Sequence, residues 1–242
     1  REDEAVHILL SSSSTSNSID ITNDESPILL KALARRLSHC CVGIQSNITS
    51  TSFKESSVKM CIPSIRCIGN IASSCDGTHV PSLLSTTSTT TLTIASRQYT
   101  TQSIATSLAT LIQRGTLSPS IASQAGDASS VLSSEAAWAT STLLCDAGLP
   151  PPHPSTVSAD ELVPSLCRAV TSGYAKLELK REATCALWNA VASPPPPSSP
   201  ILDDNAMMKR NPETTIHTRD CILHGIVQTD GMIQSLTELI RA

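Results

Sequence analysis

Two segments of the sequence place a carboxylate, a bulky or soft side chain and a polar side chain at the same spacing. The positions i, i+3 and i+7 are taken by Glu135, Trp138 and Thr142 in one segment and by Glu182, Cys185 and Asn189 in the other. On an α-helix these three positions share one face. A carboxylate attracts cations, an indole ring stacks on cations and on aliphatic stems, and an amide both donates and accepts hydrogen bonds. Each segment therefore predicts a helix face that can hold a ligand with cationic and polar groups.

The motifs of the common catalytic sites do not occur in the sequence. GxSxG, HExxH, GxxxxGK[ST] and a Gly-rich phosphate loop are all absent. The six histidines show no metal-ligand spacing with the cysteines. We therefore expect no enzymatic activity, no metal and no cofactor. A catalytic Cys–His pair needs only to meet in space, so this alternative stays open.

The nine cysteines form neither a CxxC pair nor a regular disulfide framework. Most of them lie inside apolar segments, where a free thiol behaves as a small buried hydrophobic group. We therefore expect free, buried thiols and a reducing compartment.

Composition excludes several classes of protein. Of the 242 residues, 40% are hydrophobic, only 2% are aromatic and 16% are charged, and the formal net charge is −4. This hydrophobic content is sufficient for a core and argues against a wholly disordered chain. The few aromatics and the acidic balance argue against a nucleic-acid partner. No signal peptide and no uninterrupted apolar run of about 18 residues are visible, so we expect no membrane span. The chain begins at Arg1 rather than Met, which favours a fragment.

The apolar residues recur mainly with helical periodicity, which predicts an all-α fold. The expected helices are Pro27–His39, Val58–Ser73, Ser103–Arg114, Ser134–Cys145, Asp160–Thr171, Lys176–Ser193 and Asp220–Arg241, the last interrupted near Asp230–Gly231. Ser158 and Asp160 are the candidate N-caps of the fifth helix. The Thr-rich tract Thr89–Ile94 resembles a strand, but its many hydroxyls favour a loop. Residues 11–27 and the long Ser/Thr-rich and Pro-rich stretches 81–101, 149–157 and 194–213 are expected to be flexible insertions.

A helical pattern that ends in small residues and an Asn, or a substitute for it, occurs three times. Its centres are Asn70, Thr142 and Asn189, separated by 72 and 47 residues. The second spacing is close to the roughly 40–47 residues of armadillo-type repeats, and the first equals one repeat plus the Ser/Thr-rich insertion. A solenoid follows, because each unit buries its apolar face only against its neighbours.

Five segments resemble the importin-alpha family of nuclear import adaptors. Residues 63–71 (PSIRCIGNI) resemble the family's P-A-L-R-x-V-G-N-I, and 135–142 (EAAWATST) resemble E-A-x-W-x-x-S-N. Residues 180–190 (KREATCALWNA) are similar to K-K-E-A-x-W-A-I-S-N-A, residues 173–176 (GYAK) to the G-D-F-K turn, and 225–239 to the opening of the next repeat. Thr142 replaces an Asn, and Cys185 replaces a Trp. The order in which these variant repeats follow one another resembles the second half of the family's repeat array.

The resemblance implies a right-handed superhelical armadillo-repeat solenoid fragment over residues 1–242, with a last partial repeat from about residue 219. It implies an adaptor, found in cytoplasm and nucleus, that binds Lys/Arg-rich nuclear localisation signals in the minor-site half of an inner groove. Its partners would be cargo proteins with such signals and importin-beta, the latter bound through a segment outside this chain. The implied peptide-binding residues are Arg66, Asn70, Asp76, Glu135, Trp138, Ser141, Glu182 and Asn189.

Simpler structural roles compete with these binding roles. The whole chain could be a generic armadillo scaffold for other peptides or proteins. Trp138 could be a core residue, Asn70 could bond its own backbone, and Arg66 could form an ion pair between repeats. Glu135 and Glu182 could be solvated helix charges. Trp188 lies three residues away from the expected Trp position, so we expect it to be buried.

Overall fold

The computed structural model describes residues 28–45, 51–74, 91–94, 97–100, 102–118, 128–145, 159–192 and 223–241. The helices in these ranges are α2 (Ile28–Gln45), α3 (Thr51–Ser74), α5 (Ile104–Arg114), α7 (Ala128–Cys145), α8 (Ala159–Thr171), α9 (Leu177–Ala192) and α11 (Met232–Arg241). A short helical turn at 223–227 precedes α11. The predicted all-α class is confirmed for the described helical ranges, with one small hairpin added to it. None of the described helices combines the length and apolar content needed to cross a membrane.

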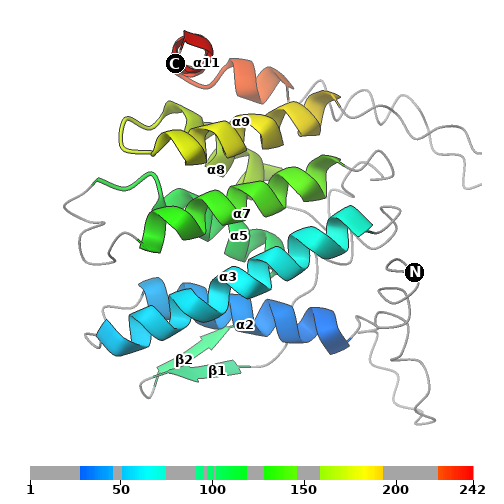
Figure 1. Cartoon of the computed structure of the whole chain (residues 1–242), viewed down its shortest axis with the longest axis vertical. Coiled ribbons are helices and arrows are strands. Elements are labelled where there is room, and N and C mark those ends of the chain that lie inside the picture. The colour runs from blue at the N-terminus through cyan, green and yellow to red at the C-terminus, as the bar shows by residue number, and fades with distance from the viewer. Residues whose placement is uncertain are drawn as a thin grey trace, which may run out of the picture.

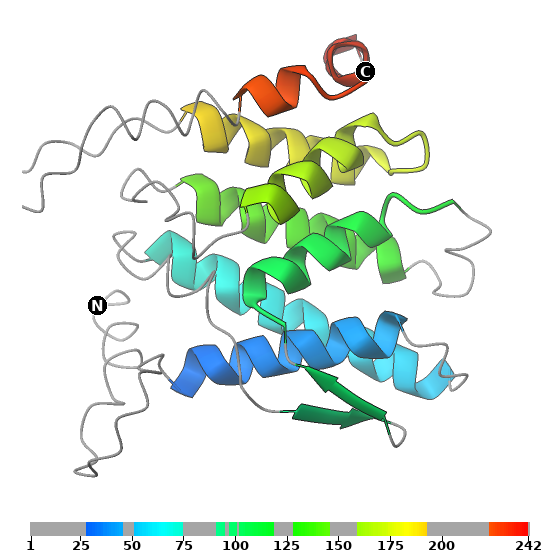
Figure 2. The ribbon, with the colours of Figure 1, turned by 180° about the vertical axis from the view of Figure 1, so that it is seen from behind.

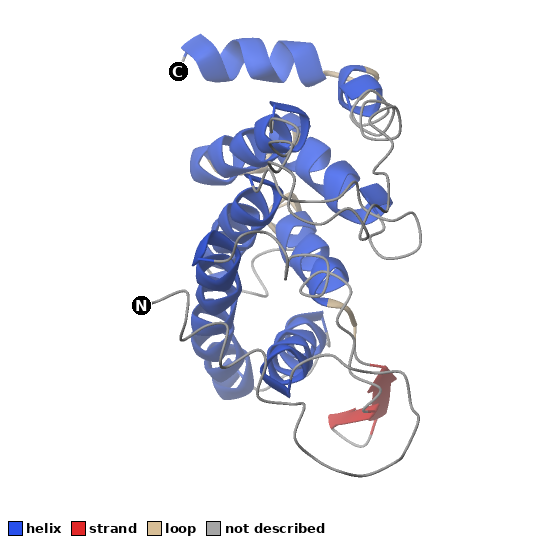
Figure 3. Cartoon of the chain, turned by 90° about the vertical axis from the view of Figure 1, so that its right-hand side faces the viewer, coloured by secondary structure: helices blue, strands red, loops and turns tan. Residues whose placement is uncertain are grey.

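The helices stack in two rows, because each exposes an apolar face that only a neighbour can cover. The long helices α3, α7 and α9 pack side by side in one row, and α2, α5 and α8 form the other. At the end of the stack α11 contacts both α8 and α9. Across the rows α2 pairs with α3, α5 with α7, and α8 with α9. Figure 1 shows the first row facing the viewer, Figure 2 shows the second from behind, and Figure 3 shows both from the side. The core is one continuous cluster between the two rows.

The expectation of a loop at Thr89–Ile94 was wrong. The strand β1 (Thr91–Ile94) pairs antiparallel with β2 (Arg97–Thr100), so that Leu92 lies opposite Tyr99. Three of the four residues of β1 are β-branched, and such side chains favour extended backbone. Pairing with β2 satisfies the backbone in a way that isolated hydroxyl side chains cannot. Figure 2 shows the hairpin beside α2, outside the row that α2 begins.

The helix boundaries follow local chemistry in some places and packing in others. Ser103 caps α5, and its hydroxyl accepts from the Thr106 backbone N–H at 3.0 Å. The helix α3 begins at Thr51, seven residues before the predicted start, and it tolerates Pro63 in its interior. Asp160 lies inside α8 rather than at its cap, and Ser158 lies outside the described residues. The predicted break near Asp230–Gly231 is confirmed, because Gly231 adopts a φ of 74° before α11 begins.

Small and hydroxyl side chains replace aromatics in the core. Ala136, Ala137 and Ala139 of α7 are completely buried, which lets neighbouring helices approach closely. Several buried or partly buried hydroxyls bond a carbonyl four residues earlier in the same helix, as Thr140 does to Ala136 at 2.8 Å. Others join helices, such as Ser133 Oγ, which donates to the Leu111 carbonyl at 2.7 Å. The described helices can therefore bury serine and threonine side chains while their hydroxyls keep hydrogen-bond partners, as Thr140 and Ser133 do.

The expectation of free, buried thiols is confirmed for four of the six cysteines that the structure describes. Cys40, Cys41, Cys61 and Cys167 are buried, Cys67 is partly buried and Cys185 is exposed. Burial raises the pKa of Cys41 to about 12, with a further contribution from Cys40. Its Sγ donates to the Ser107 carbonyl at 3.5 Å. Cys41 is therefore a neutral packing residue that joins α2 to α5.

Candidate functional site

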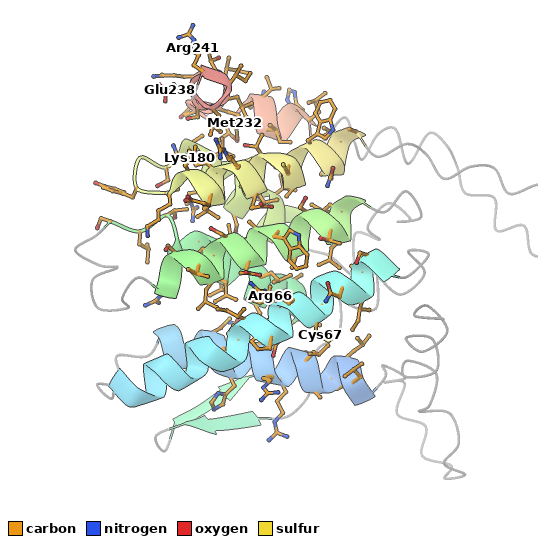
Figure 4. The ribbon with its side chains drawn as sticks, viewed as in Figure 1. Arg66, Cys67, Lys180, Met232, Glu238 and Arg241 are labelled. Atoms are coloured by element: carbon orange, nitrogen blue, oxygen red, sulfur yellow. The ribbon has the colours of Figure 1, made fainter. Side chains whose placement is uncertain are left out.

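A groove of about 730 Å³ lies where α3, α7 and the start of α9 meet. The α7 side chains that line it are spaced so that they share one face of that helix. The groove is lined by Arg66, Asn70, Ser130, Val131, Ser134, Glu135, Trp138, Lys176, Glu178 and Glu182. Figure 4 shows Arg66 on α3, turned toward α7. The groove therefore joins an apolar wall to charged groups of both signs.

Trp138 forms the aromatic wall of the groove and lies against the backbone of α3. A methyl group built on Gly69 would come within 2.5 Å of the indole Cζ3 and 2.7 Å of Cη2. Only a glycine therefore lets the ring lie this close to α3 without displacement. The indole is partly buried against the core cluster and also lines the groove. The two roles proposed for Trp138 are thus compatible: one part of the ring packs and another part is presented to a ligand.

A bidentate ion pair joins α3 to α7 at the groove. Arg66 Nε donates to Glu135 Oε2 at 3.0 Å, and Arg66 Nη2 donates to Glu135 Oε1 at 2.5 Å. The hydrogen bond to Glu135 and its charge raise the pKa of Arg66. The Arg66 side chain is 59% exposed and that of Glu135 is 18% exposed, so water screens the pair on the arginine side. The ion pair fixes the orientation of Glu135, and it also occupies both carboxylate oxygens.

Glu182 extends the acidic side of the groove onto α9. Burial raises the pKa of Glu182, and the nearby charge of Glu135 raises it further. Glu178 lies one turn earlier on α9 and lines the same groove. The groove holds three carboxylates against the two cations Arg66 and Lys176, which leaves a formal charge of −1. A ligand cation beside Glu182 would relieve the repulsion between Glu182 and Glu135.

Asn189 and Ser141 lie outside the groove lining, at the contact between α7 and α9. Asn189 Nδ2 donates to the Ser141 carbonyl at 3.1 Å and lies 3.0 Å from Ser141 Oγ. Ser141 is only 8% exposed. Thr142, at the expected Asn position, donates to the Trp138 carbonyl at 3.0 Å. These polar groups therefore bond α7 and α9 to each other and α7 to itself.

Five of the eight predicted site residues line one groove: Arg66, Asn70, Glu135, Trp138 and Glu182. Ser141 and Asn189 are brought together elsewhere, and Asp76 lies outside the described residues. Sequence reasoning missed Glu178 and Lys176. The i, i+4 spacing of Glu178 and Glu182 was a usable signal, because it places both carboxylates on one helix face. Lys176 lies in the turn that precedes α9 and also lines the groove. Helical spacing does not predict this position, because Lys176 lies outside the helix.

The expectation that Trp188 is buried was wrong, because its side chain is 68% exposed. The buried residues of α9 are Leu179, Ala183, Ala186 and Leu187. Trp188 follows Ala183 by five residues, which turns it about 140° around the helix from Ala183. Cys185, at the position where a second groove Trp was expected, is also exposed. The structure thus holds one tryptophan in the groove and another on an open surface.

Within the described ranges, no group of three or more His, Cys, Asp or Glu side chains is arranged to hold a metal ion. No protein-family model, curated protein or solved structure significantly matches the chain.

Proposed function

We propose that the protein is an armadillo-repeat solenoid of the importin-alpha type that binds Lys/Arg-rich nuclear localisation signals. The ligand lies extended along the row formed by α3, α7 and α9, in the minor-site half of the adaptor's groove. In this role the protein moves between cytoplasm and nucleus with basic cargo proteins. Importin-beta is the expected carrier, bound through a segment outside this chain.

The observation that carries the proposal is the position of Trp138 between acidic side chains from two helices. Glu135 and Trp138 belong to α7, and Glu182 belongs to α9, and all three line the same groove. A lysine or arginine side chain can lay its aliphatic stem on the indole and place its charged head beside Glu182. The stacking contributes about 0.5–2 kcal/mol for each basic side chain.

The arrangement of helices supports the solenoid part of the proposal. Successive helix pairs stack so that α7 contacts both α3 and α9, and α5 contacts both α2 and α8. Such nearest-neighbour packing is typical of repeat proteins. It presents one continuous row of long helices, on which an extended peptide can contact several units in turn.

Three features weaken the proposed site relative to a complete groove. Arg66 occupies the carboxylate of Glu135, and Thr142 bonds its own helix. Cys185 offers no aromatic wall beside Glu182. Each missing anchor is expected to weaken binding by roughly 1–3 kcal/mol, the usual cost of truncating an important side chain in an interface. We therefore expect selective but weak binding, concentrated at the single stem-binding wall of Trp138.

Fluorescence anisotropy with a labelled bipartite Lys/Arg-rich peptide tests the proposal. The peptide should bind the full chain, and the affinity should fall steeply with salt because ion pairing is screened. Trp138→Ala should weaken binding about tenfold or more. Glu182→Gln, which preserves side-chain size, should weaken it without loss of helix content. Trp188→Ala is the matched control, because it removes the exposed tryptophan outside the groove.

A second peptide separates the proposal from the generic scaffold. Its basic residues are replaced by alanine or glutamine, so that the backbone and length are kept. If this peptide binds as well as the basic one, or if Trp138→Ala has no effect on binding, the protein is a scaffold without specificity for basic signals.

A further inference from the structure

Two cysteines meet where the helices α2 and α3 pack together. Cys40 belongs to α2 and Cys61 to α3, and both side chains are completely buried. The Cys61 thiol donates a hydrogen bond to the sulfur of Cys40. Neither cysteine is part of a disulfide in the structure. The contact between α2 and α3 therefore holds two thiols that touch each other across two helices.

The surroundings favour the thiolate form of one member of this pair. The hydrogen bond from Cys61 lowers the pKa of Cys40, burial opposes this change, and the positive charge of Arg36 supports it. The same hydrogen bond and burial raise the pKa of Cys61. The thiolate, rather than the thiol, is the nucleophile in cysteine chemistry. Cys40 is therefore the member that reacts first with an oxidant, and Cys61 is held beside it as the second thiol.

A third cysteine in the same region has a different partner. Cys41 follows Cys40 in α2, but its Sγ donates to the Ser107 carbonyl of α5 at 3.5 Å. Burial raises the pKa of Cys41 to about 12. Consecutive side chains of an α-helix are turned about 100° from each other, so Cys41 faces α5 while Cys40 faces α3. The structure therefore favours a pair of Cys40 with Cys61 over a pair of Cys41 with Cys61.

Both members of the pair lie where the backbone of their helix is weakly held. Pro63 lies inside α3, two residues after Cys61, and it has no N–H to bond the carbonyl four residues earlier. Cys40 lies in the last turns of α2, five residues before the helix ends at Gln45. Such places open locally more readily than the interior of a regular helix. Local opening therefore gives a small oxidant access to thiols that are buried in the closed structure.

We propose that Cys40 and Cys61 form a reversible disulfide when the protein meets hydrogen peroxide. The Cys40 thiolate attacks one peroxide oxygen, the O–O bond breaks, and the departing hydroxide takes up the proton that Cys40 had released. Cys40 is then a sulfenic acid. The Cys61 sulfur attacks the Cys40 sulfur and displaces a second hydroxide, which takes up the Cys61 proton. Two thiols have then lost two electrons and two protons, and one peroxide has become two waters.

The disulfide ties α2 to α3 at the N-terminal part of the stack (Figure 1). A cross-link of this span stabilises the folded chain, because it restricts the unfolded one. A small thiol such as glutathione reverses it by exchange. The oxidation is separate from the proposed function, because neither cysteine lines the groove and the reaction needs no peptide ligand.

Peptide mapping of the full chain after treatment with hydrogen peroxide tests the proposal. Trypsin releases Cys40 and Cys41 together in the peptide 37–54, and it releases Cys61 in the peptide 60–66. Mass spectrometry without reduction should find these two peptides joined in the treated wild-type chain, and dithiothreitol should separate them. Cys40→Ser should abolish the joined product. Cys41→Ser is the matched control and should leave its yield unchanged.

Thermal unfolding measures the effect of the disulfide on the fold. Peroxide should raise the Tm of the wild-type chain by about 6–12 °C, and dithiothreitol should reverse the rise. The rise should be absent in Cys40→Ser and present in Cys41→Ser. Circular dichroism of the untreated variants shows whether their helix content is kept.

The exposed Cys185 serves as an internal standard for the reaction with peroxide. If the peptide 60–66 stays unlinked in the wild-type chain at peroxide concentrations that oxidise Cys185, the proposal is wrong. This mapping needs no variant, so it decides the question even if serine at a buried position destabilises the chain. A joined product that Cys41→Ser abolishes and Cys40→Ser preserves also overturns the proposal, because Cys41 would then be the reactive thiol.

Discussion

The contacts of α7 with its two neighbours are built from different chemistry. Toward α3, α7 uses an indole ring laid on Gly69 and a bidentate ion pair between Arg66 and Glu135. Toward α9, it uses the buried Ser141, which Asn189 bonds at 3.1 Å and 3.0 Å. Both contacts belong to the same row of helices and to the same type of sequence segment.

The two contacts differ because only one of them has an aromatic residue at the predicted groove position. At the α3–α7 contact the aromatic residue is kept, so the indole both packs and lines the groove. At the α7–α9 contact Cys185 stands at the equivalent position, and the amide joins the two helices instead. We infer that the first contact holds most of the binding capacity and that the second mainly holds the stack together.

The largest expected effect is on stability at the α3–α7 contact. Trp138→Ala should lower the free energy of unfolding by about 2–4 kcal/mol, because the ring fills the space above Gly69. Trp188→Ala should change it by less than about 0.5 kcal/mol, because that side chain is mostly in solvent. Urea denaturation at low protein concentration measures both. Equal losses from the two variants would contradict the asymmetry.

The close approach of the ring to α3 can be tested from the other side. Gly69→Ala should destabilise the chain by about 1–3 kcal/mol, because the new methyl group overlaps the indole. Gly173→Ala is the control, since nothing lies within 4 Å of its methyl group. In the Trp138→Ala background the penalty at Gly69 should largely disappear. Simple additivity of the two substitutions in denaturation experiments would show that the two residues do not touch.

A smaller effect is expected at the α7–α9 contact. Asn189→Ala should cost about 1 kcal/mol, since it removes the donor that reaches Ser141. The matched control is Asn70→Ala, an exposed asparagine on α3, which should be near neutral in stability. If Asn70→Ala proves the more destabilising in thermal unfolding, the assignment of Asn189 as the structural amide is wrong.

An aromatic ring added at the α7–α9 contact should give it a stacking wall like the one at the α3–α7 contact. Cys185→Trp places an indole one turn from Glu182 on an exposed position, so the fold should tolerate it. Affinity for the basic peptide should rise by about two- to fivefold, as one added cation–π contact implies. Anisotropy measures the gain, and Cys185→Leu controls for added apolar surface alone. A gain that leucine reproduces in full would exclude the stacking mechanism.

The smallest expected effect is a pH dependence of basic-peptide binding. The pKa of Glu182 is raised, so its carboxylate takes up a proton at a higher pH than an ordinary glutamate. Only the charged form pairs with a ligand cation, so affinity should fall as pH decreases through this raised pKa. Glu182→Gln should have a flatter pH profile over the same range. A profile that the substitution leaves unchanged would assign the pH dependence to another group.

The helical character of the chain could be predicted from apolar periodicity, and the resemblance to the importin-alpha family indicated the five residues that line the groove. Glu135 and Trp138 share one face of α7 whatever the tilt of that helix. The prediction that Arg66 and Asn70 lie on one helix is also confirmed, because both belong to α3. The sequence could not predict the partners of these side chains. The pairing of Arg66 with Glu135 spans 69 positions along the chain and depends on how α3 and α7 cross.

Two of the wrong predictions have related causes. Trp188 was expected to be buried because it lies three residues away from the groove position, but the packed face of α9 is set by Leu179 and Ala183, and Trp188 lies away from it. The tract at Thr89–Ile94 was expected to be a loop because its hydroxyls are polar, but pairing with Arg97–Thr100 decided its conformation. In both cases packing or pairing with other residues decided the outcome, and the polarity of the residue itself did not.

The sequence by itself determined which stretches of the chain are helical, because apolar periodicity is a local property. It also determined which groups share a helix face, because that depends only on 3.6 residues per turn. Only the tertiary structure decided that Trp138 meets Gly69, that Glu182 meets the charge of Glu135, and that Asn189 reaches Ser141 rather than the groove. These contacts depend on the distance and angle between helices, which many residues set together through close packing.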